Sequence, residues 1–172
     1  LAQDLDLVVV ASANAVHAEH ALAAIKAGIP VVVEKPMART LAETESILSE
    51  SEKSGVAVTA FYNRLWDSDI LTIKKVAANG LIGTVFRLDS RFERYRPQLN
   101  PAAWRESLTP AEGGGLLLDL QTHLLSTALD CFGPADLTYA SVRKIRGDSE
   151  DDVVLNLRHH SGVDSYCSVS AI

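Results

Sequence analysis

Two ionisable side chains on one predicted helix could do acid–base chemistry. Asp119 and His123 are four residues apart in a Leu-rich segment, so on a helix they lie one above the other on the same face. Polar groups are costly to bury without a partner or a role. An imidazole exchanges protons near neutral pH, which suits a general base. A capping or self-paired couple on an exposed stripe is the alternative interpretation.

A lysine follows a predicted buried strand. Glu34-Lys35-Pro36 comes directly after the apolar run 29–33, at the carboxyl end of a strand, where open α/β sheets bind their ligands. Lys35 would project into that crevice, and Pro36 would fix the backbone after it. Taken alone, a lysine in this place is more often a solvated loop residue.

Four other features could contribute to a site. His17, one turn after Ser12-Ala13-Asn14, is expected to face the same crevice. The triplet 113–115 allows close backbone approach and would expose helix N–H groups to a ligand, although a glycine triplet is often only a flexible loop. Trp104 could roof a pocket or simply fill one. The arginines at 91, 94, 96 and 105 could bind an anion, with a charged sheet face as the default.

Strands and helices alternate in the first part of the chain. Apolar, β-branched runs predict strands at 7–11, 29–33 and 56–61, of the kind that is buried on both faces of a parallel sheet. Helices are predicted at 15–27 and 40–54, the second beginning with the capping box Thr40-Leu41-Ala42-Glu43. Strand, helix, strand, helix, strand with short loops is typical of a doubly wound α/β sheet.

The pattern changes after residue 62. Residues 84–96 alternate strictly, with Phe86, Leu88, Ser90 and Phe92 on one face, which predicts a strand covered on one side only. The remaining predicted elements are helices at 68–79 and 116–132 and strands at 137–146, 153–160 and 163–172, the last two joined by a hairpin at Ser161-Gly162. We therefore expect two partial domains, 1–62 and 63–172, the second being an α+β domain with an open, largely antiparallel sheet.

Composition excludes several classes of function. The 172 residues are 47% hydrophobic and 22% charged, as in ordinary globular proteins. Sixteen basic against 22 acidic residues give a net charge of −6 with no basic run, which argues against nucleic acid or an anionic membrane as partner. No apolar stretch is long enough to span a bilayer. Cys131 and Cys167 have no metal-like spacing, so we expect no metal site and a reducing, cytoplasmic compartment.

Together, these residues resemble the Gfo/Idh/MocA oxidoreductases, which are nicotinamide-dependent sugar, inositol and diol dehydrogenases. The resemblance runs in the right order over nearly the whole chain. It is carried by Ala11-Ser12-Ala13-Asn14-x-x-His17, Glu34-Lys35-Pro36, Asn63-Arg64 and Gly113-Gly114-Gly115-x-x-x-Asp119-x-x-x-His123. The stretches 63–67 and 91–97 are similar to the NADP-preferring scyllo-inositol dehydrogenase branch. The fold class implied is α/β, the C-terminal half of a Rossmann-type nucleotide-binding domain followed by the α+β domain.

Two departures from the family pattern are visible. Gln121 stands where the family commonly has glycine between the Asp and the His, and is expected to narrow the substrate pocket. None of the ten glycines falls in a G-x-G-x-x-G pattern, so the phosphate-binding loop is expected upstream of Leu1. The chain starts at Leu1 and stops within a predicted strand, and we expect that both ends are cut from a longer chain.

The resemblance implies hydride transfer between a secondary alcohol of a sugar, inositol or related polyol and NAD or NADP. His123 would take the hydroxyl proton, Lys35 would stabilise the developing alkoxide, and Asp119 would fix a neighbouring hydroxyl or orient the imidazole. The Lys35–Pro36 peptide is expected to be cis, as in relatives. The residues expected to bind the cofactor are Ser12, Ala13, Asn14, His17, Glu34, Lys35, Asn63 and Trp104.

Alternatives remain open at this point. The same fold could serve a non-catalytic regulator that binds a dinucleotide or sugar, or an NAD-dependent glycosidase. The 172 residues taken alone are expected to be inactive and to associate through open sheet edges. A homo-oligomer formed through the C-terminal sheet is expected. The sequence decides neither the substrate nor the choice between NAD and NADP.

Overall fold

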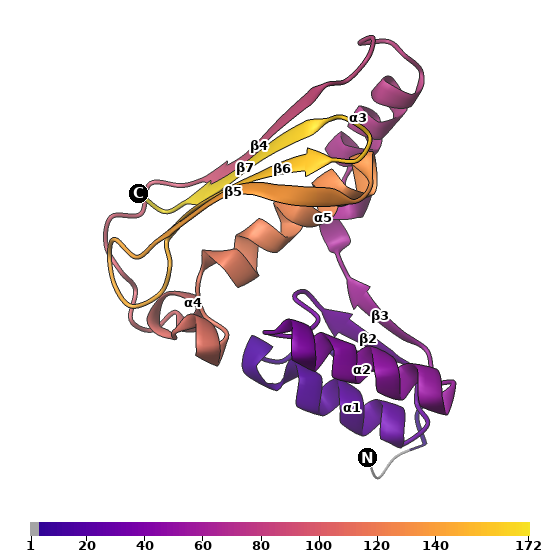
Figure 1. The fold of residues 1–172 in the computed structure, drawn as a ribbon. Coiled ribbons are helices and arrows are strands. Elements are labelled where there is room, and N and C mark those ends of the chain that lie inside the picture. Colours follow the sequence, from indigo (N-terminus) through magenta and orange to yellow (C-terminus); the bar gives the residue numbers. More distant parts are fainter. Residues whose placement is uncertain (1–3) are drawn as a thin grey trace. The chain divides into compact units, whose positions relative to one another are not determined.

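The computed structural model describes residues 4–172, which form two compact units (Figure 1). The first comprises the chain up to Tyr62 together with Pro110–Gly113, and the second comprises Asn63–Thr109 and Gly114–Ile172. Each unit has its own sheet and its own hydrophobic core. No helix within residues 4–172 combines the length and the apolar character that crossing a membrane requires.

The first unit is built on a three-stranded parallel sheet in the order β1-β2-β3. Its elements are β1 (Val8–Val10), a 3₁₀ turn (Asn14–Val16), α1 (His17–Lys26), β2 (Val31–Glu34), α2 (Leu41–Ser54), β3 (Val58–Phe61) and a second 3₁₀ turn (Pro110–Glu112). The alternation of strands and helices predicted from the sequence is confirmed. Because all three strands run the same way, the loops that follow them emerge at one edge of the sheet.

Both helices of the first unit cover the same face of its sheet. Ile25 of α1 and Ile47 of α2 pack with Val31 and Val33 of β2 in one buried cluster. Val9, which points to the other face, is 61% exposed. The expectation that these strands are buried on both faces is therefore wrong for the part of the chain that the structure describes. The reason is that α1 and α2 pack against each other and so form a single layer.

The predicted capping box is present at the start of α2, but one of its two hydrogen bonds goes to a different residue. The hydroxyl of Thr40 accepts a hydrogen bond from the backbone N–H of Glu43 at 3.2 Å, as predicted. The Glu43 carboxylate accepts from the backbone N–H of Arg39 at 2.9 Å, one residue before the cap. A hydrogen bond from the Arg39 side chain lowers the pKa of Glu43. The start of α2 is thus tied to the segment that follows Lys35 and Pro36.

The second unit is an α+β structure with a four-stranded sheet in the order β4-β7-β6-β5. Its helices and turns are a 3₁₀ turn (Asn63–Trp66), α3 (Ser68–Ala78), α4 (Trp104–Ser107), a π-helical turn (Leu117–Gln121) and α5 (Thr122–Phe132). Its strands are β4 (Arg87–Glu93), β5 (Ala135–Arg143), β6 (Asp152–His159) and β7 (Asp164–Ser170). Only β4 and β7 pair in parallel, so the prediction of a largely antiparallel sheet is confirmed.

One face of this sheet is covered by α5, which Figure 1 shows lying along it. Leu124 and Ala128 of α5 are buried with Val153 and Leu155 of β6 and with Cys167 of β7. Side chains alternate along β4 as predicted, with Leu88, Ser90 and Phe92 half-buried and their neighbours exposed. Phe86 is the exception at 75% exposed, because β4 begins only at Arg87.

Candidate active site

The loops after β1 and β2 carry most of the predicted cofactor-binding residues. Ser12 and Ala13 follow β1 and are exposed, whereas Asn14 is buried at 6% exposure. Glu34 is the last residue of β2, and Lys35 follows it, both half-buried. The Lys35–Pro36 peptide is cis, as the resemblance implied. These five residues lie at the edge of a parallel sheet that α/β proteins use for ligands.

Asn14 holds a distant segment of the chain against the first unit. Its side-chain amide donates to the carbonyl of Gly113 at 2.9 Å, and a Cβ on Gly113 would lie 2.9 Å from the Asn14 Cβ. Arg39 donates from Nη1 to the carbonyl of Ala111 at 2.8 Å. The two side chains explain why Pro110–Gly113 belongs to this unit. Arg39 was not singled out in the sequence, because a lone arginine next to a helix start has no distinctive pattern.

His17 links the ends of β1 and β2. It is 1% exposed, and its Nδ1 lies 2.8 Å from the carbonyl oxygen of Pro36 while its Nε2 lies 3.0 Å from that of Ser12. A carbonyl oxygen only accepts, so each contact is a hydrogen bond only where that nitrogen carries hydrogen. The ring is thus directed at the backbone of the two loops. Its predicted contact with a cofactor stays a prediction.

His123 and Asp119 lie on the helical segment of the second unit. Asp119 is in the π-helical turn and His123 is the second residue of α5. π-helical turns are wider than α-helical ones and are common at functional sites. His123 is 6% exposed, and its ring packs against that of Phe92 in β4 at an angle of 66°, with 6.4 Å between the centroids. The covered face of β4 thus packs directly against the candidate base.

Asp119 is paired with an arginine from the irregular segment. Arg105 Nε lies 3.1 Å from Asp119 Oδ1, and the guanidinium of Arg105 stacks over the indole of Trp104 at 4.2 Å. The backbone of Arg105 is fixed too, since its carbonyl accepts from the N–H of Gly115 at 2.9 Å. Sequence reasoning gave Arg105 only as a possible anion ligand. Its contact with Asp119 could not be predicted, because the two residues are 14 positions apart and the segment between them has no regular periodicity.

The glycine triplet is required by close packing rather than by a ligand at the helix start. A Cβ on Gly114 would overlap the carbonyl of Leu108, and one on Gly115 would overlap the carboxylate of Glu150. The backbone N–H groups of Leu116 and Leu117 donate to the carbonyl and the carboxylate of Glu150, at 3.1 and 3.2 Å. The expectation that these N–H groups are open to a ligand is therefore wrong, because Glu150 already occupies them.

Gln121 is directed into the helix–sheet contact. It is fully buried, and its side-chain amide donates to the carbonyl of Cys167 in β7 at 3.2 Å. The expectation that Gln121 narrows a substrate pocket is not met in this unit. The wider π-helical turn, which ends at Gln121, points its side chain at the sheet.

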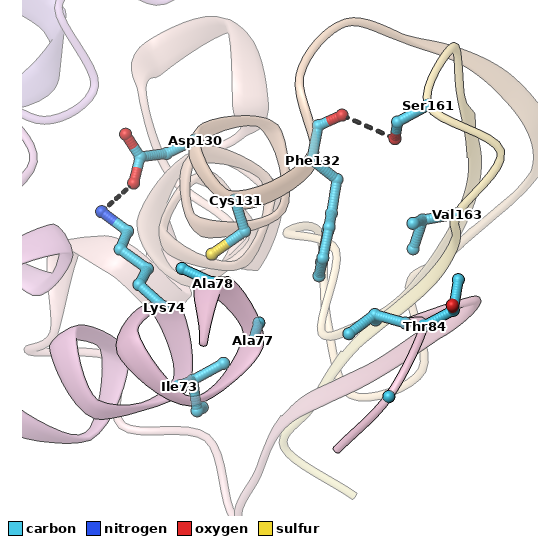
Figure 2. Close-up of a pocket in the computed structure, with 12 residues that line it drawn as sticks. Ile73, Lys74, Ala77, Ala78, Thr84, Asp130, Cys131, Phe132, Ser161 and Val163 are labelled. Carbon is cyan, nitrogen blue, oxygen red and sulfur yellow. Dashed lines mark hydrogen bonds and ion pairs between the residues drawn. The ribbon is translucent and has the colours of Figure 1, made fainter. Parts of the chain in front are cut away.

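Three cavities of the second unit separate the predicted residues. Asp119 and Trp104 line one of about 230 Å³ together with Arg105. His123 lines another of about 260 Å³, with Arg64 and Phe92. A third, of about 510 Å³, lies between α3 and the end of α5, where Lys74 and Asp130 form an ion pair beside Cys131 (Figure 2). None of the predicted site residues lines this third cavity.

The predicted residues are divided between the two units. Ser12, Ala13, Asn14, His17, Glu34 and Lys35 belong to the first, and Asn63, Trp104, Asp119 and His123 belong to the second. Asn63 is exposed at the start of its 3₁₀ turn. Within residues 4–172, no three side chains of His, Cys, Asp or Glu gather in a way that could hold a metal ion.

Comparison with known proteins gives consistent matches along the chain. Residues 1–62 match the family model described as "Oxidoreductase family, NAD-binding Rossmann fold", and residues 70–172 match the "GFO/IDH/MocA C-terminal domain". The chain is 36% identical over 146 residues to scyllo-inositol 2-dehydrogenase (NADP(+)) IolW of Bacillus subtilis, covering 85% of this chain and 40% of that protein. It is 40% identical over 136 residues to the uncharacterized oxidoreductase YdgJ of Escherichia coli, covering 78% and 38%.

Solved structures give the same result. A putative oxidoreductase from Yersinia pestis matches with a TM-score of 0.85 and 34% identity, over 98% of this chain and 47% of that one. The chain thus spans about two-fifths of the length of the two curated relatives and about half of that structure. The second family model alone covers more than half of the 172 residues. The chain therefore belongs to the GFO/IDH/MocA family of oxidoreductases.

Proposed function

We propose that the protein transfers a hydride between a secondary alcohol of a sugar, inositol or related polyol and NAD or NADP. The observation that carries the proposal is His123, a histidine buried against Phe92 one helical turn after an aspartate that Arg105 holds. The names of relatives support the substrate class, since IolW is a scyllo-inositol dehydrogenase and a 30% identical protein of Ensifer adhaerens is a 1,5-anhydro-D-fructose reductase.

His123 is the base in this proposal. When the alcohol loses its hydride, its hydroxyl proton must leave, and an imidazole can accept that proton at neutral pH. The ammonium of Lys35 donates a hydrogen bond to the same oxygen and stabilises its developing negative charge. Asp119 accepts from a neighbouring hydroxyl of the substrate. Its ion pair with Arg105 holds its carboxylate in place.

The residues present fit the nicotinamide end of a dinucleotide. Exposed Ser12 and Ala13 leave the backbone after β1 open to a planar ring, while Glu34 and Lys35 offer polar groups at the end of the next strand. Asn14 has its carbonyl oxygen and a second N–H beyond the bond to Gly113. Asn63 and Trp104 complete the proposed set. A bound nicotinamide would supply the hydride acceptor.

The decisive experiment uses the intact protein. NADH and NADPH are titrated first, followed by a screen of polyols and sugars for reduction of the oxidised cofactor. We expect His123→Asn to lower turnover by about 10²–10⁴-fold with cofactor affinity little changed. Lys35→Met should reduce both turnover and substrate binding. His160→Asn, an exposed histidine in the β6–β7 loop, is the matched control and should change neither.

The outcomes separate the proposal from its alternatives. Unchanged turnover in His123→Asn would mean that another group is the base. Tight cofactor binding without oxidation of any polyol would favour a regulator, and release of a free sugar from a glycoside would favour a glycosidase.

The proposal includes a homo-oligomer and a cytoplasmic location. The face of the β4-β7-β6-β5 sheet opposite α5 carries half-exposed Tyr139 and the ring of Tyr166, over which Arg87 stacks at 4.5 Å. Aromatic and arginine side chains are enriched in protein interfaces. Cys131 and Cys167 are free thiols, which fits a reducing compartment. Chromatography with light scattering on the intact protein, and on Tyr139→Asp, tests the assembly.

A further inference from the structure

The small cavity beside Asp119 is rich in arginine. Four arginines and two carboxylates line its 230 Å³ volume, with Trp104 on one side. Sites for drug-sized ligands have volumes of roughly 300–1,000 Å³. The cavity therefore suits a ligand group no larger than a sugar acid or phosphate. A positive excess in a partly enclosed space attracts anions.

Two of the four arginines are already neutralised. Arg105 pairs with Asp119 at 3.1 Å. Arg146 is 6% exposed, and its Nε lies 3.0 Å from a carboxylate oxygen of Asp151, with Glu106 at 3.6 Å. Two arginines therefore face three carboxylates, so with Arg94 and Arg96 added the group has one positive charge in excess.

Arg94 and Arg96 account for the excess charge. Among residues 4–172, neither side chain has an ion-pair or hydrogen-bonding partner, whereas both backbones are fixed. Their N–H groups donate to the carbonyls of Ser170 and Ala171, each at 2.9 Å, so the chain continues beside β7 past the end of β4. The carbonyl of Arg96 also accepts from Arg146. The backbone is thus held, while neither guanidinium group is engaged by a side chain among the described residues.

The placement of these arginines follows from the alternation along β4. Leu88, Ser90 and Phe92 lie on the face that α5 covers, and Phe92 contacts His123. Arg94 is the next residue of this series, and both it and Arg96 line the cavity that Asp119 lines. Phe92 thus contacts the candidate base His123, and the segment that follows β4 places two guanidinium groups in the cavity that Asp119 lines.

We propose that Arg94 and Arg96 bind an acidic group, carboxylate or phosphate, on the sugar or polyol substrate. The inference rests on the proposed function, and it narrows the substrate class from neutral polyols to sugar acids or sugar phosphates. Guanidinium groups bind such oxyanions through two parallel N–H donors. The substrate would reach Asp119 with a hydroxyl and the two arginines with its acidic group.

The test measures binding of three matched sugars to the intact protein by calorimetry. D-glucuronate, D-glucose 6-phosphate and D-glucose differ in the group at one carbon, so they separate a carboxylate, a phosphate and no charge. We expect one of the two acidic sugars to bind at least about tenfold more tightly than D-glucose, the range of a hydrogen bond to a charged group. Added KCl should weaken this preference in the wild-type protein.

Variants test whether the preference for acidic sugars depends on the two arginines of the cavity. The double variant Arg94→Gln/Arg96→Gln should lose the preference and bind all three sugars alike. Lys144→Gln is the control, because Lys144 is an exposed cation that lines none of the three cavities described above. Equal binding of the three sugars by the wild-type protein, or a preference that survives in the double variant, would overturn the inference. So would weaker NADPH binding in the double variant with the sugar preference intact, which would assign the arginines to a cofactor phosphate.

Failure of this inference is distinguishable from failure of the proposed function. Oxidation of neutral polyols with no preference for acidic ones would reject the anion site and leave the dehydrogenase in place. Absence of hydride transfer to any substrate would reject the dehydrogenase, whereas the binding preference is measured without turnover.

Discussion

The two units bury polar side chains for different purposes. In the first, the buried polar residues Asn14 and His17 sit at the edge of the sheet and bond to the backbone of loops. In the second, Gln121 and Glu150 are buried where the helical segment meets the sheet and the loop before β6. Polar contacts therefore order the candidate loops in one unit and hold the candidate helix in the other.

Truncating one core residue in each unit should have the largest effect. Ile47 is fully buried in the first unit and Leu124 is 3% exposed in the second. Ile47→Ala and Leu124→Ala should each lower the free energy of unfolding by about 2–5 kcal/mol, because each leaves a cavity in a separate core. Calorimetry of the intact protein should show two transitions, each variant shifting one of them. A shift of one shared transition by both variants would break the distinction between the units.

Adding a methyl group at Gly114 tests how closely the glycine triplet is packed. Gly114→Ala should lower the free energy of unfolding by about 3 kcal/mol, since its Cβ would overlap the backbone carbonyl of Leu108. Gly28 of the first unit has open space around it, so Gly28→Ala should lose only the roughly 1–2 kcal/mol of its left-handed conformation. Chemical unfolding measures both. Equal losses would mean that the backbone of Leu108 moves aside.

Much of this arrangement could be predicted from local patterns. The apolar runs 29–33 and 56–61 predicted β2 and β3, and strict alternation predicted which face of β4 is covered. These features depend only on neighbours in the sequence, which is why they were accessible. The place of Lys35 after a strand and of Asp119 and His123 on a helical segment was predicted in the same way, because strand and helix periodicity place these residues. The π-helical turn at Asp119 was not predicted, and Asp119 and His123 line different cavities.

The features that could not be predicted depend on residues far apart in the chain. Glu150 caps a helical segment that begins more than 30 residues earlier, and Arg105 reaches Asp119 from an irregular segment. The parallel pairing of β4 with β7 joins strands that are separated in the chain by β5, β6 and several helical segments. A single sequence carries no signal for such pairs, since neither partner has a distinctive neighbourhood.

Each unit also has a buried histidine that contacts polar atoms of distant residues, and the two histidines can be compared directly. His17 joins the carbonyls of Ser12 and Pro36, whereas His159 lies 2.8 Å from both the carbonyl of Gly133 and the hydroxyl of Ser165. His17→Ala and His159→Ala should each lower the free energy of unfolding by about 1–3 kcal/mol, the range for leaving buried polar groups unpaired.

The two variants should be destabilised in different parts of the molecule. Hydrogen exchange in His17→Ala should speed up at the amides of Lys35 and Met37, because the loop after β2 loses its link to β1. In His159→Ala, exchange should speed up along β6 and β7. Protection at Lys35 that is unchanged in His17→Ala would mean that the histidine does not order this loop.

The smallest expected effects concern the two thiols. They are the rate at which the thiols are alkylated and the pH dependence of the free energy of unfolding. Burial raises the pKa of Cys167 to about 11, with a smaller contribution from Asp89, and burial also raises the pKa of Cys131. Alkylation requires the thiolate and access to it. In the folded protein, Cys131 should therefore react slowly with iodoacetamide at pH 8, and Cys167, which is fully buried, should react only on unfolding.

The raised pKa of Cys167 also sets the direction of a pH effect on stability. The unfolded thiol releases its proton near its ordinary pKa of 9.0, whereas the folded one holds it until about pH 11. The folded state then binds more protons than the unfolded state, so the free energy of unfolding falls as pH rises through this interval. Cys167→Ala should unfold with less dependence on pH between these values, and Cys131→Ala, which removes a less buried thiol, should change the slope less. An unchanged slope in Cys167→Ala would mean that the contact between α5 and the sheet does not shield this thiol from water.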